Sequence, residues 1–434
     1  MSEGLGNCPP HPACRFGWRD GELLIGGRKV SQLHDATGRR PFYAYDGGIL
    51  RARMAALREA VPDDIAVHYA VKANGFPPVL ACMSRLADGF DVASRGEMEA
   101  LLALGVPGER LVFAGPGKGR DEIASAVAAG VRIVIEDVSE LDDVAAALTA
   151  TGAAVPPRLA VRLNPPFALK RAGLKMGGEA TAFGISPEAL APLLRRARAL
   201  GLVIDGLHVF SGSQSLDGMA LAESHRETAK LLRDLAVAHE LSLAWVSLGG
   251  GYGIPYVTGE RPLDLTQVAT GLRDAVAILR MVAPHVEVAV ELGRYLVGEA
   301  GVYVMQVLRR KTVHGRTVLV TDGGLHHHLA ATGNFGQVLH RPFPMALATR
   351  MPAGIDNWDA DDESEPREAV TIAGRLCTPL DVFARRLSLP PARPGDLIAV
   401  FQSGAYGFEA SPHAFLNHPP PVRLFVEATE RGKS

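Results

Sequence analysis

From about residue 47 to residue 300, short runs rich in β-branched residues alternate with longer amphipathic segments. The longer segments, such as residues 95–104 and 187–200, repeat apolar residues every three or four positions, which is typical of helices. Eight parallel strands joined by helices close naturally into a barrel, whereas doubly wound sheets usually have fewer strands. We therefore predict an α/β fold, a (β/α)8 TIM barrel. Its strands are predicted at residues 65–71, 89–93, 110–114, 131–135, 158–163, 203–209, 243–248 and 286–291.

Outside the predicted barrel the pattern is mostly β. Four runs after residue 300 are predicted as strands without regular helices between them, at residues 301–308, 317–322, 369–373 and 396–402. Residues 22–25 and 42–45 are also predicted strands and are expected to join this domain. The acidic stretch 356–365 is expected to be a solvated loop. We therefore predict N-terminal strands in residues 1–46, the barrel in residues 47–300 and a C-terminal β domain in residues 301–434.

The composition is that of a globular protein. Hydrophobic residues make up 47% and charged residues 21% of the 434 residues, and 45 Lys plus Arg nearly balance 47 Asp plus Glu. No basic run is interleaved with aromatic residues, and the apolar runs are too short to span a bilayer. The N-terminus lacks the basic start and apolar core of a signal peptide, and four scattered cysteines are too few for a disulfide framework. We expect a cytoplasmic protein with neither a nucleic-acid nor a membrane partner.

Active groups in such a barrel are expected just after the carboxyl ends of the strands. Lys72 follows the first strand in HYAVKAN. A solvated lysine at a strand end is the simpler explanation, but a desolvated lysine there is suited to form a Schiff base. After the sixth strand, His208 and Phe210 are two residues apart and share a face, and Ser213 follows in GSQ. Ordinary core positions would explain His208 and Phe210 equally well.

Two further clusters end the seventh and eighth strands. Residues 249–253 (GGGYG) expose backbone N–H groups and suit a phosphate, although tight turns use the same residues. Glu291 stands near Arg294 in ELGR, where a structural ion pair is the alternative. Together, a lysine, an aromatic platform, a glycine cradle and a buried carboxylate describe a pyridoxal-phosphate site. The carboxylate would keep the pyridine nitrogen protonated, so that the ring can absorb carbanion charge.

Two candidates lie in the predicted β domain. Cys377 stands in GRLCTPLD, four residues before Asp381, and Tyr406 stands in FQSGAYG among small residues. A lone cysteine is more often an inert small hydrophobic residue, and Tyr406 could be an ordinary turn tyrosine.

Three other motifs receive no function. The adjacent histidines 326–328 point in different directions and have no acid or cysteine spacing typical of a metal site. Residues 8–14, with two cysteines and a histidine, lie in a Pro-rich stretch that is expected to be flexible. Residues 115–120 (GPGKGR) lack the Walker spacing and the Ser or Thr that follows its lysine. No metal is therefore expected.

The motifs together resemble those of the alanine-racemase-fold pyridoxal-phosphate decarboxylases, the group of diaminopimelate, ornithine and arginine decarboxylases. The resemblance covers about residues 40–420. HYAVKAN matches the family's Schiff-base motif, and GSQ, GGGYG and ELGR match its cofactor motifs, with Leu292 in place of a proline. The resemblance implies a barrel with an alanine racemase-like second domain, and pyridoxal 5'-phosphate as cofactor. The residues assigned to the cofactor are Lys72, His208, Phe210, Ser213, Gly250, Gly251, Glu291, Gly293, Arg294 and Tyr406.

The resemblance also implies that two chains share each site. Cys377 matches the cysteine that acts from the neighbouring subunit, and Tyr406 matches the tyrosine that touches the cofactor phosphate. A head-to-tail homodimer with composite active sites is therefore implied, with Lys72 and Cys377 as the catalytic residues. Racemases share the barrel but use a tyrosine on the second face, so the Cys377 motif favours decarboxylation.

Departures from the family pattern bear on the substrate. Phe210 replaces the histidine that usually stacks on the cofactor ring. Thr378 stands where diaminopimelate decarboxylases carry a glutamate that grips a distal ammonium, and Ala330 and Ala331 replace an Arg-Pro pair that grips a distal carboxylate. Without these protein charges, the distal ammonium and carboxylate of diaminopimelate would be buried without partners, which would weaken its binding. Diaminopimelate itself is therefore not the expected substrate.

TDGGLHHHLA, CTPLD and FQSGAYG most resemble decarboxylases found with exosortase and exopolysaccharide gene sets, and enzymes that decarboxylate glutamate tethered to an acyl carrier protein. The expected substrate is thus an amino acid or an aminoacyl carrier protein, because a thioester has no distal charge that the site would need to bind. His340 and Arg341 could instead read a carboxylate or a phosphopantetheine. A racemase and a degenerate, non-catalytic binding protein remain alternatives. The expected substrate-binding residues are Arg294, Arg341, Thr378, Asp381 and Tyr406.

Overall fold

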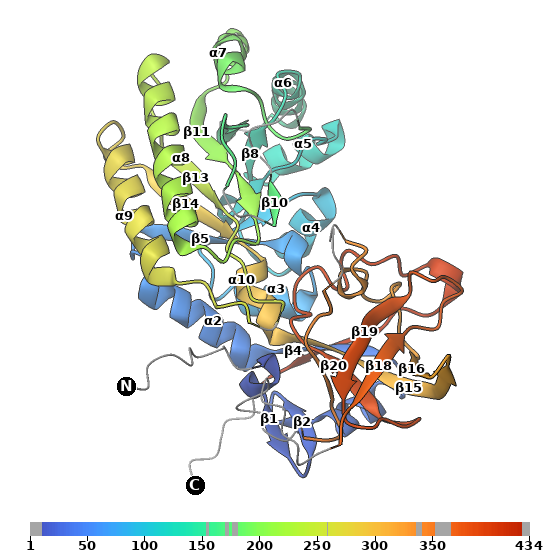
Figure 1. Ribbon diagram of the computed structural model, residues 1–434. Coiled ribbons are helices and arrows are strands. Elements are labelled where there is room, and N and C mark those ends of the chain that lie inside the picture. Colours follow the sequence, from blue (N-terminus) through green and yellow to red (C-terminus); the bar gives the residue numbers. More distant parts are fainter. Residues whose placement is uncertain are drawn as a thin grey trace, which may run out of the picture. The chain divides into compact units, whose positions relative to one another are not determined.

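The computed structural model describes residues 11–152, 156–169, 173–175, 181–257, 259–335, 341–351 and 366–427. Cys8, His340 and the acidic stretch 356–365 lie outside these residues. The chain forms two compact units (Figure 1). The barrel unit consists of Met54–Ile254 and Leu263–Leu296. The β unit consists of Met1–Arg53, Pro255–Pro262 and Val297–Ser434.

The barrel unit contains a closed, parallel eight-stranded barrel, which confirms the predicted fold class. Strands such as β6 and β9 are buried along their whole length, as expected where helices cover one face and the barrel interior the other. In barrel order the strands are β11 (Ile204–Val209), β13 (Trp245–Gly250), β14 (Glu287–Leu292), β5 (Ile65–Ala70), β6 (Gly89–Val92), β7 (Leu111–Phe113), β8 (Arg132–Ile135) and β9 (Leu159–Leu163).

Three of the outer helices begin at side-chain caps and therefore start at defined residues. Ser94 accepts the N–H of Glu97 at α4, Asp217 that of Ala220 at α8, and Asp264 that of Thr266 at α9. The helices are α2 (Gly47–Ala60), α3 (Pro77–Met83), α4 (Arg95–Ala103), α5 (Arg120–Ala128), α6 (Glu140–Thr151), α7 (Leu190–Ala199), α8 (Gly218–Ala238), α9 (Leu265–Arg280) and the short α10 (Arg294–Val297).

The β unit is built on a mixed sheet, so the mostly β second domain is also confirmed. Its strands pair in the order β17 (Met345–Leu347), β20 (Leu397–Val400), β15 (Gly301–Val313), β16 (Arg316–Thr321), β18 (Glu368–Ala373) and β19 (Val382–Leu389). β4 (Phe42–Asp46) pairs with β15 and with β21 (Val422–Val426). Residues 22–25 form β2 in a separate three-stranded sheet with β1 (Gly17–Arg19) and β3 (Arg28–Lys29), and this small sheet is part of the β unit.

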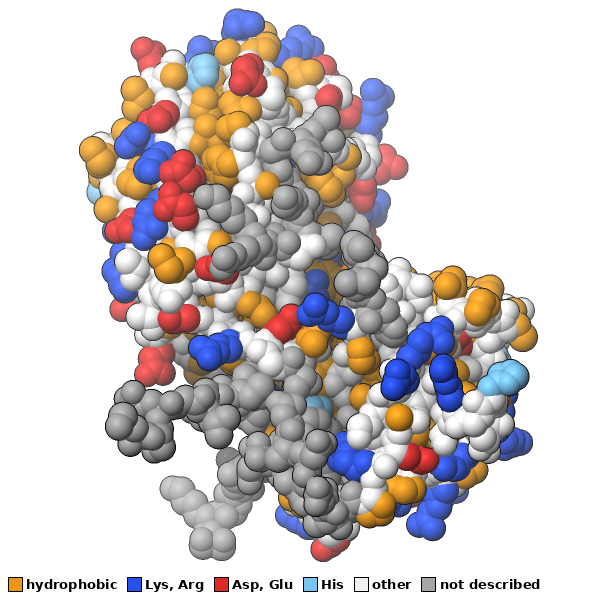
Figure 2. All heavy atoms as spheres, viewed as in Figure 1, with side chains coloured by type: hydrophobic (Ala, Val, Ile, Leu, Met, Phe, Trp, Pro, Cys, Tyr) orange, Lys and Arg blue, Asp and Glu red, His pale blue; other side chains and the backbone are white. Residues whose placement is uncertain are grey.

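Basic side chains are concentrated on part of the β unit's surface. Lys and Arg side chains gather over β18 and β19 of the β unit (Figure 2). In the described part of the chain, no helix is both long and apolar enough to cross a membrane.

Candidate active site

Lys72 lies at the carboxyl end of β5, in a short 3-10 turn (Val71–Ala73). Its Nζ is 3.6 Å from Oδ2 of Asp91 and 5.5 Å from the centre of the Phe210 ring. Asp91 reaches this position because β6 is the neighbouring strand and pairs Asp91 with Ala70. Lys72 is half-exposed and Asp91 is buried, so the amine lies at the barrel mouth above a buried carboxylate.

Glu291, on β14, is a second buried carboxylate. Its Oε1 is 2.9 Å from Nε2 of His208 and accepts a hydrogen bond of 2.7 Å from the Ser247 hydroxyl. The hydroxyl of Ser247 in turn accepts the N–H of Gly249, at 3.1 Å. Three adjacent strands, β11, β13 and β14, thus hold one carboxylate in a fixed orientation.

The two carboxyl groups titrate in opposite directions. Burial opposes ionisation of Glu291, but the charge and hydrogen bond of His208, the Ser247 hydroxyl and Lys72 outweigh it and lower the pKa of Glu291. Burial and the negative charge of Glu291 raise the pKa of Asp91 to about 6, against the attraction of Lys72. The site therefore keeps Glu291 ionised and places a more readily protonated carboxyl beside the lysine.

The glycine turn after β13 packs directly against the segment that carries Ser213. Gly251 has a φ of +85°, and a Cβ there would lie 2.3 Å from the carbonyl oxygen of Gly212. At Gly250 a Cβ would lie 1.9 Å from the carbonyl oxygen of Glu291. Only glycine fits both positions, so the turn and β12 (Gly212–Ser213) lie against each other.

Gly293 and Arg294 follow β14. A Cβ on Gly293 would lie 2.7 Å from the Cβ of Ala73, so this glycine lets the chain pass close to the Lys72 turn. Arg294 is half-buried at the start of α10. The barrel unit therefore brings together nine of the ten residues that were assigned to the cofactor.

The residues of the barrel unit fit pyridoxal phosphate. Among the described residues, Oδ1 of Asp91 and Nδ1 of His208 have no hydrogen-bond partner; both atoms are buried near the Lys72 amine, which lies over the half-buried Phe210 ring. An ionised Glu291 matches a protonated pyridine nitrogen, and Lys72 supplies the amine that reacts with an aldehyde. Ser213 and the glycine turn supply hydroxyl and N–H groups for a phosphate.

The remaining expected residues belong to the β unit. Cys377 is exposed and Thr378 half-buried in the loop of residues 374–381 that joins β18 to β19, which we name the Cys377 loop. Tyr406 has a φ of +59° and stacks on Phe335 with ring centres 6.3 Å apart. Arg341 is exposed.

Asp381 is buried and closes the Cys377 loop. Its Oδ1 accepts the N–H of Leu325 at 2.6 Å, and its Oδ2 accepts that of Leu376 at 2.8 Å. Its carbonyl accepts the N–H of Gly374 at 2.9 Å. This geometry favours a role in holding the loop, while a contact with substrate stays a prediction.

The motifs that received no function are structural where the chain is described. His327 is hydrogen-bonded to Tyr303 and to the carbonyl of Pro419, and His328 to Ser403. Lys118, the lysine of GPGKGR, is buried 3.0 Å from Glu140. No group of three or more metal-ligating side chains was found in the part of the chain that the structure describes.

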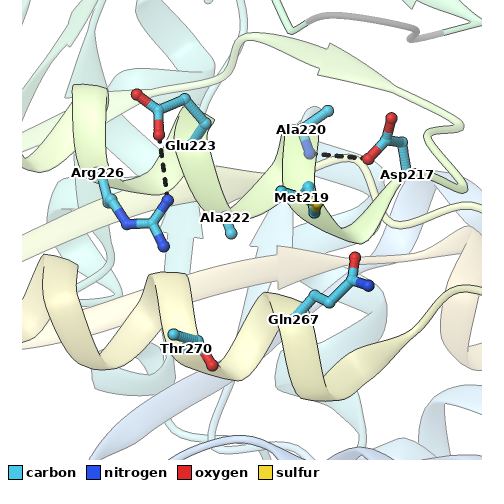
Figure 3. A pocket seen from close by; sticks show the side chains of 8 residues that line it. All are labelled: Asp217, Met219, Ala220, Ala222, Glu223, Arg226, Gln267 and Thr270. Atoms are coloured by element: carbon cyan, nitrogen blue, oxygen red, sulfur yellow. Dashed lines mark hydrogen bonds and ion pairs between the residues drawn. The ribbon is translucent and has the colours of Figure 1, made fainter.

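A groove of about 650 Å³ lies between α8 and α9 (Figure 3). Three of its polar side chains are already engaged: Asp217 caps α8, and Glu223 pairs with Arg226 at 3.1 Å. None of the expected site residues lines it, so it is separate from the Lys72 cluster. The lining residues are Asp217, Met219, Ala220, Ala222, Glu223, Arg226, Gln267 and Thr270.

Asp91 and Ser247 are site residues that the sequence motifs did not indicate. Both stand on predicted strands, Asp91 near the carboxyl end of the second and Ser247 in the seventh, just before GGGYG. Their position in a predicted strand, near its carboxyl end, was therefore the available indication of a role in the site. A single carboxylate or hydroxyl there belongs to no spacing pattern that would set it apart from an ordinary strand residue.

The sequence of the barrel region shows to which family the chain belongs. Residues 48–298 match the family described as pyridoxal-dependent decarboxylase, pyridoxal binding domain. The chain belongs to this family. The protein is thus a pyridoxal-phosphate-dependent decarboxylase, as the motifs predicted, and pyridoxal phosphate is its cofactor.

Relatives of the decarboxylase cover nearly its whole length. It is 34% identical over 390 residues to the L-glutamyl-[BtrI acyl-carrier protein] decarboxylase of Niallia circulans, covering 88% of each chain. It is 32% identical over 399 residues to the 2-[(L-alanin-3-ylcarbamoyl)methyl]-2-hydroxybutanedioate decarboxylase of Staphylococcus aureus, covering 89% of this chain and 94% of the relative. The structure of a diaminopimelate decarboxylase from M. jannaschii with L-lysine matches with a TM-score of 0.84 at 23% identity, over 95% of this chain and 92% of that one. That likeness shows the fold alone.

Proposed function

We propose that the decarboxylase acts on an L-amino acid carried as a thioester on a carrier protein, with L-glutamate as the first aminoacyl group to test. The observation that carries this proposal is the absence of a distal-charge clamp at Thr378, Ala330 and Ala331. None of these three side chains carries a charge, and Ala331 is buried. The likeness to an enzyme named for an acyl-carrier-protein substrate supports the same assignment.

The proposed reaction uses residues of both units. When bound, pyridoxal phosphate supplies an electron sink for the electron pair that remains when the carboxylate of the substrate leaves as carbon dioxide. Glu291 holds the proton on the pyridine nitrogen, because His208 and Ser247 keep it ionised. Lys72 would hold the cofactor through its amine when no substrate is bound, and Phe210 would pack against the cofactor ring.

Further residues are proposed to bind the cofactor phosphate and to return a proton to the substrate. Ser213, the glycine turn with Gly250 and Gly251, and Gly293 are proposed to bind the phosphate, together with Arg294 and Tyr406. Cys377 is proposed to donate a proton from its thiol to Cα of the substrate, which restores a neutral carbon centre before the amine product leaves.

We further propose a homodimer in which Cys377 serves the barrel of the partner chain. Cys377 and its neighbour Leu380 are exposed, and so are Phe335, Phe415 and Leu416 of the same unit. Large apolar side chains exposed on one unit are typical of a surface that another chain covers. A cytoplasmic location is part of the same proposal.

Carbon dioxide release from matched substrates tests the function. The cofactor-loaded enzyme is given free L-glutamate, L-ornithine, L-lysine and L-arginine, then L-glutamyl-S-pantetheine and an acyl carrier protein loaded with L-glutamate. We expect release from the two thioesters and none from the free amino acids. Rapid release from a free amino acid would contradict the tethered substrate, and the Lys72→Ala variant is the control that removes catalysis.

A further inference from the structure

Four strands of the β unit present a positively charged face. Residues that pair across neighbouring strands share a face of the sheet. In β15 and β16, Arg309 pairs with Val320, Lys311 with Val318, and Val313 with Arg316, so the three basic side chains lie on one face. We name this the basic face.

The basic face continues across β18 and β19. Val318 pairs with Thr371 of β18, so Thr371 lies on the basic face. The buried Ala384 of β19 pairs with the buried Ile372, on the opposite face. A bulge then leaves two exposed residues, Arg385 and Arg386, opposite Thr371, and Arg385, which follows Ala384 directly, lies on the basic face. The basic face therefore comprises Arg309, Lys311, Arg316 and Arg385, with Val318, Val320, Ala373 and Val382 between them.

The charges of the basic face are not neutralised by neighbouring carboxylates. All four basic side chains are exposed, and none of them belongs to an ion pair with another described residue. Glu368, the one carboxylate on these four strands, pairs with Arg310 on the other face. The concentration of Lys and Arg over β18 and β19 is visible in Figure 2.

We propose that the basic face docks the carrier protein that delivers the aminoacyl thioester, through an acidic helix of that carrier; this rests on the proposed function. β18 and β19 are joined by the Cys377 loop, and Ala373 pairs with Val382 at its base. Arg385 is three residues beyond Val382, roughly 10 Å along the strand. A carrier held on this face therefore lies beside the loop with the proposed proton donor.

The shape and chemistry of the basic face fit a helix better than a nucleic acid. Four strands spaced about 4.8 Å apart span roughly 15 Å, enough for a helix about 10 Å wide. Val318, Val320 and Val382 supply apolar contact between the charges, as in a protein interface. Single-stranded nucleic acids are usually bound by aromatic stacking, and none of the described residues on this face is aromatic.

Charge reversal on the holoenzyme tests the docking. The Lys311→Glu/Arg385→Glu variant is compared with the wild type and with Arg195→Glu/Arg198→Glu, which reverses two exposed arginines of the barrel unit. The substrates are L-glutamyl-loaded BtrI acyl carrier protein and L-glutamyl-S-pantetheine. We expect KM for the loaded carrier to rise roughly tenfold with kcat unchanged, and the effect to shrink as salt screens the charges. KM for L-glutamyl-S-pantetheine, and both constants of the control variant, should not change.

The other outcomes separate the two proposals. Turnover of both substrates with an unchanged KM for the carrier overturns the docking face and leaves the proposed function standing. If the wild type turns over neither thioester, both the docking face and the proposed function are overturned. If the variant instead loses binding to a single-stranded oligonucleotide while its KM for the carrier is unchanged, the face is a nucleic-acid site and the docking is overturned.

Discussion

Asp91 and Glu291 are two buried carboxyl groups under one lysine, and their surroundings separate their pKa values. Glu291 is held ionised by His208 and Ser247, whereas burial and the charge of Glu291 raise the pKa of Asp91 to about 6. A carboxyl group with a raised pKa binds its proton more tightly in the folded protein than in the unfolded chain. Asp91 therefore favours folding fully below its unfolded pKa, and this contribution is lost as the pH rises through about 6.

Replacing Asp91 by Asn should make this loss visible. We expect the free energy of unfolding of Asp91→Asn, relative to the wild type, to increase between about pH 4 and about pH 7, by up to about 3 kcal/mol. The reason is that Asn does not ionise, so only the wild type loses stability as its buried carboxyl gives up the proton. Urea denaturation of the cofactor-free protein at a series of pH values measures the difference.

A matched control is Asp63→Asn, which removes an exposed carboxylate from the same unit. It gives the pH dependence that arises from the change in net charge alone. A stability difference for Asp91→Asn that stays constant over this pH range, or follows the control, would contradict the raised pKa of Asp91.

At the scale of an element, the buried side chain of Asp381 helps to hold the Cys377 loop. Asp381 accepts the N–H groups of Leu325 and Leu376, so it ties the loop to the turn after β16. Gly374 leaves room for this contact, because a Cβ there would lie 2.2 Å from Oδ2 of Asp381. The position of Cys377 therefore depends on a carboxylate four residues away.

The Asp381→Asn variant should loosen the loop without removing the thiol. The amide side chain keeps one acceptor oxygen but turns a donor toward the second N–H. For a buried pair this lowers the free energy of unfolding by about 2 kcal/mol. We expect faster hydrogen exchange at the amides of Leu325 and Leu376, a lower Tm and a lower kcat. Exchange monitored by mass spectrometry or NMR, together with steady-state kinetics, measures these effects.

The control for this variant is Asp396→Asn, because Asp396 accepts the N–H of Arg393 in a different turn. It should leave exchange at Leu325 and Leu376 unchanged. If Asp381→Asn raises KM while exchange at both amides stays at the wild-type rate, Asp381 binds substrate instead of holding the loop.

Much of the element pattern follows from hydrophobic periodicity. All eight barrel strands were predicted within a few residues, because each is a short buried run followed in most cases by an amphipathic helix. β19 was missed because bulges interrupt its pairing with β18, and two adjacent arginines, Arg385 and Arg386, are both exposed. β17 and β21 were missed because short strands at the sheet margin carry little alternation.

The candidate site was predictable only where its residues form motifs. Lys72, Glu291 and the glycine turn stand in recognisable patterns at strand ends. Asp91 and Ser247 do not, because their roles depend on which strands are neighbours in the barrel, and that pairing is a property of the closed sheet. The hydrogen bonds of Asp381 to two separate turns are likewise visible only in three dimensions.

At the scale of the whole molecule, the total charge conceals the distribution of charge. A net charge of -2 gave no reason to expect a basic surface. The sheet of the β unit nevertheless gathers basic residues from β15, β16 and β19 on one face, because alternate residues of a strand point to the same side. The net charge of a protein influences its solubility. Recognition of a partner depends instead on which side chains the strand register places on the same face of the sheet.

The two proposed catalytic residues also belong to different units, Lys72 to the barrel unit and Cys377 to the β unit. If the sites are composite, a dimer of one Lys72→Ala chain and one Cys377→Ala chain has one site with both substitutions and one intact site. We expect such a heterodimer, co-expressed with two different affinity tags, to form amine product at about half the wild-type rate, while each parent homodimer forms little or none. An inactive heterodimer that still migrates as a dimer in gel filtration would show that each chain completes its own site. Mixed chains that both carry Lys72→Ala are the matched control, since no arrangement of those chains restores a complete site.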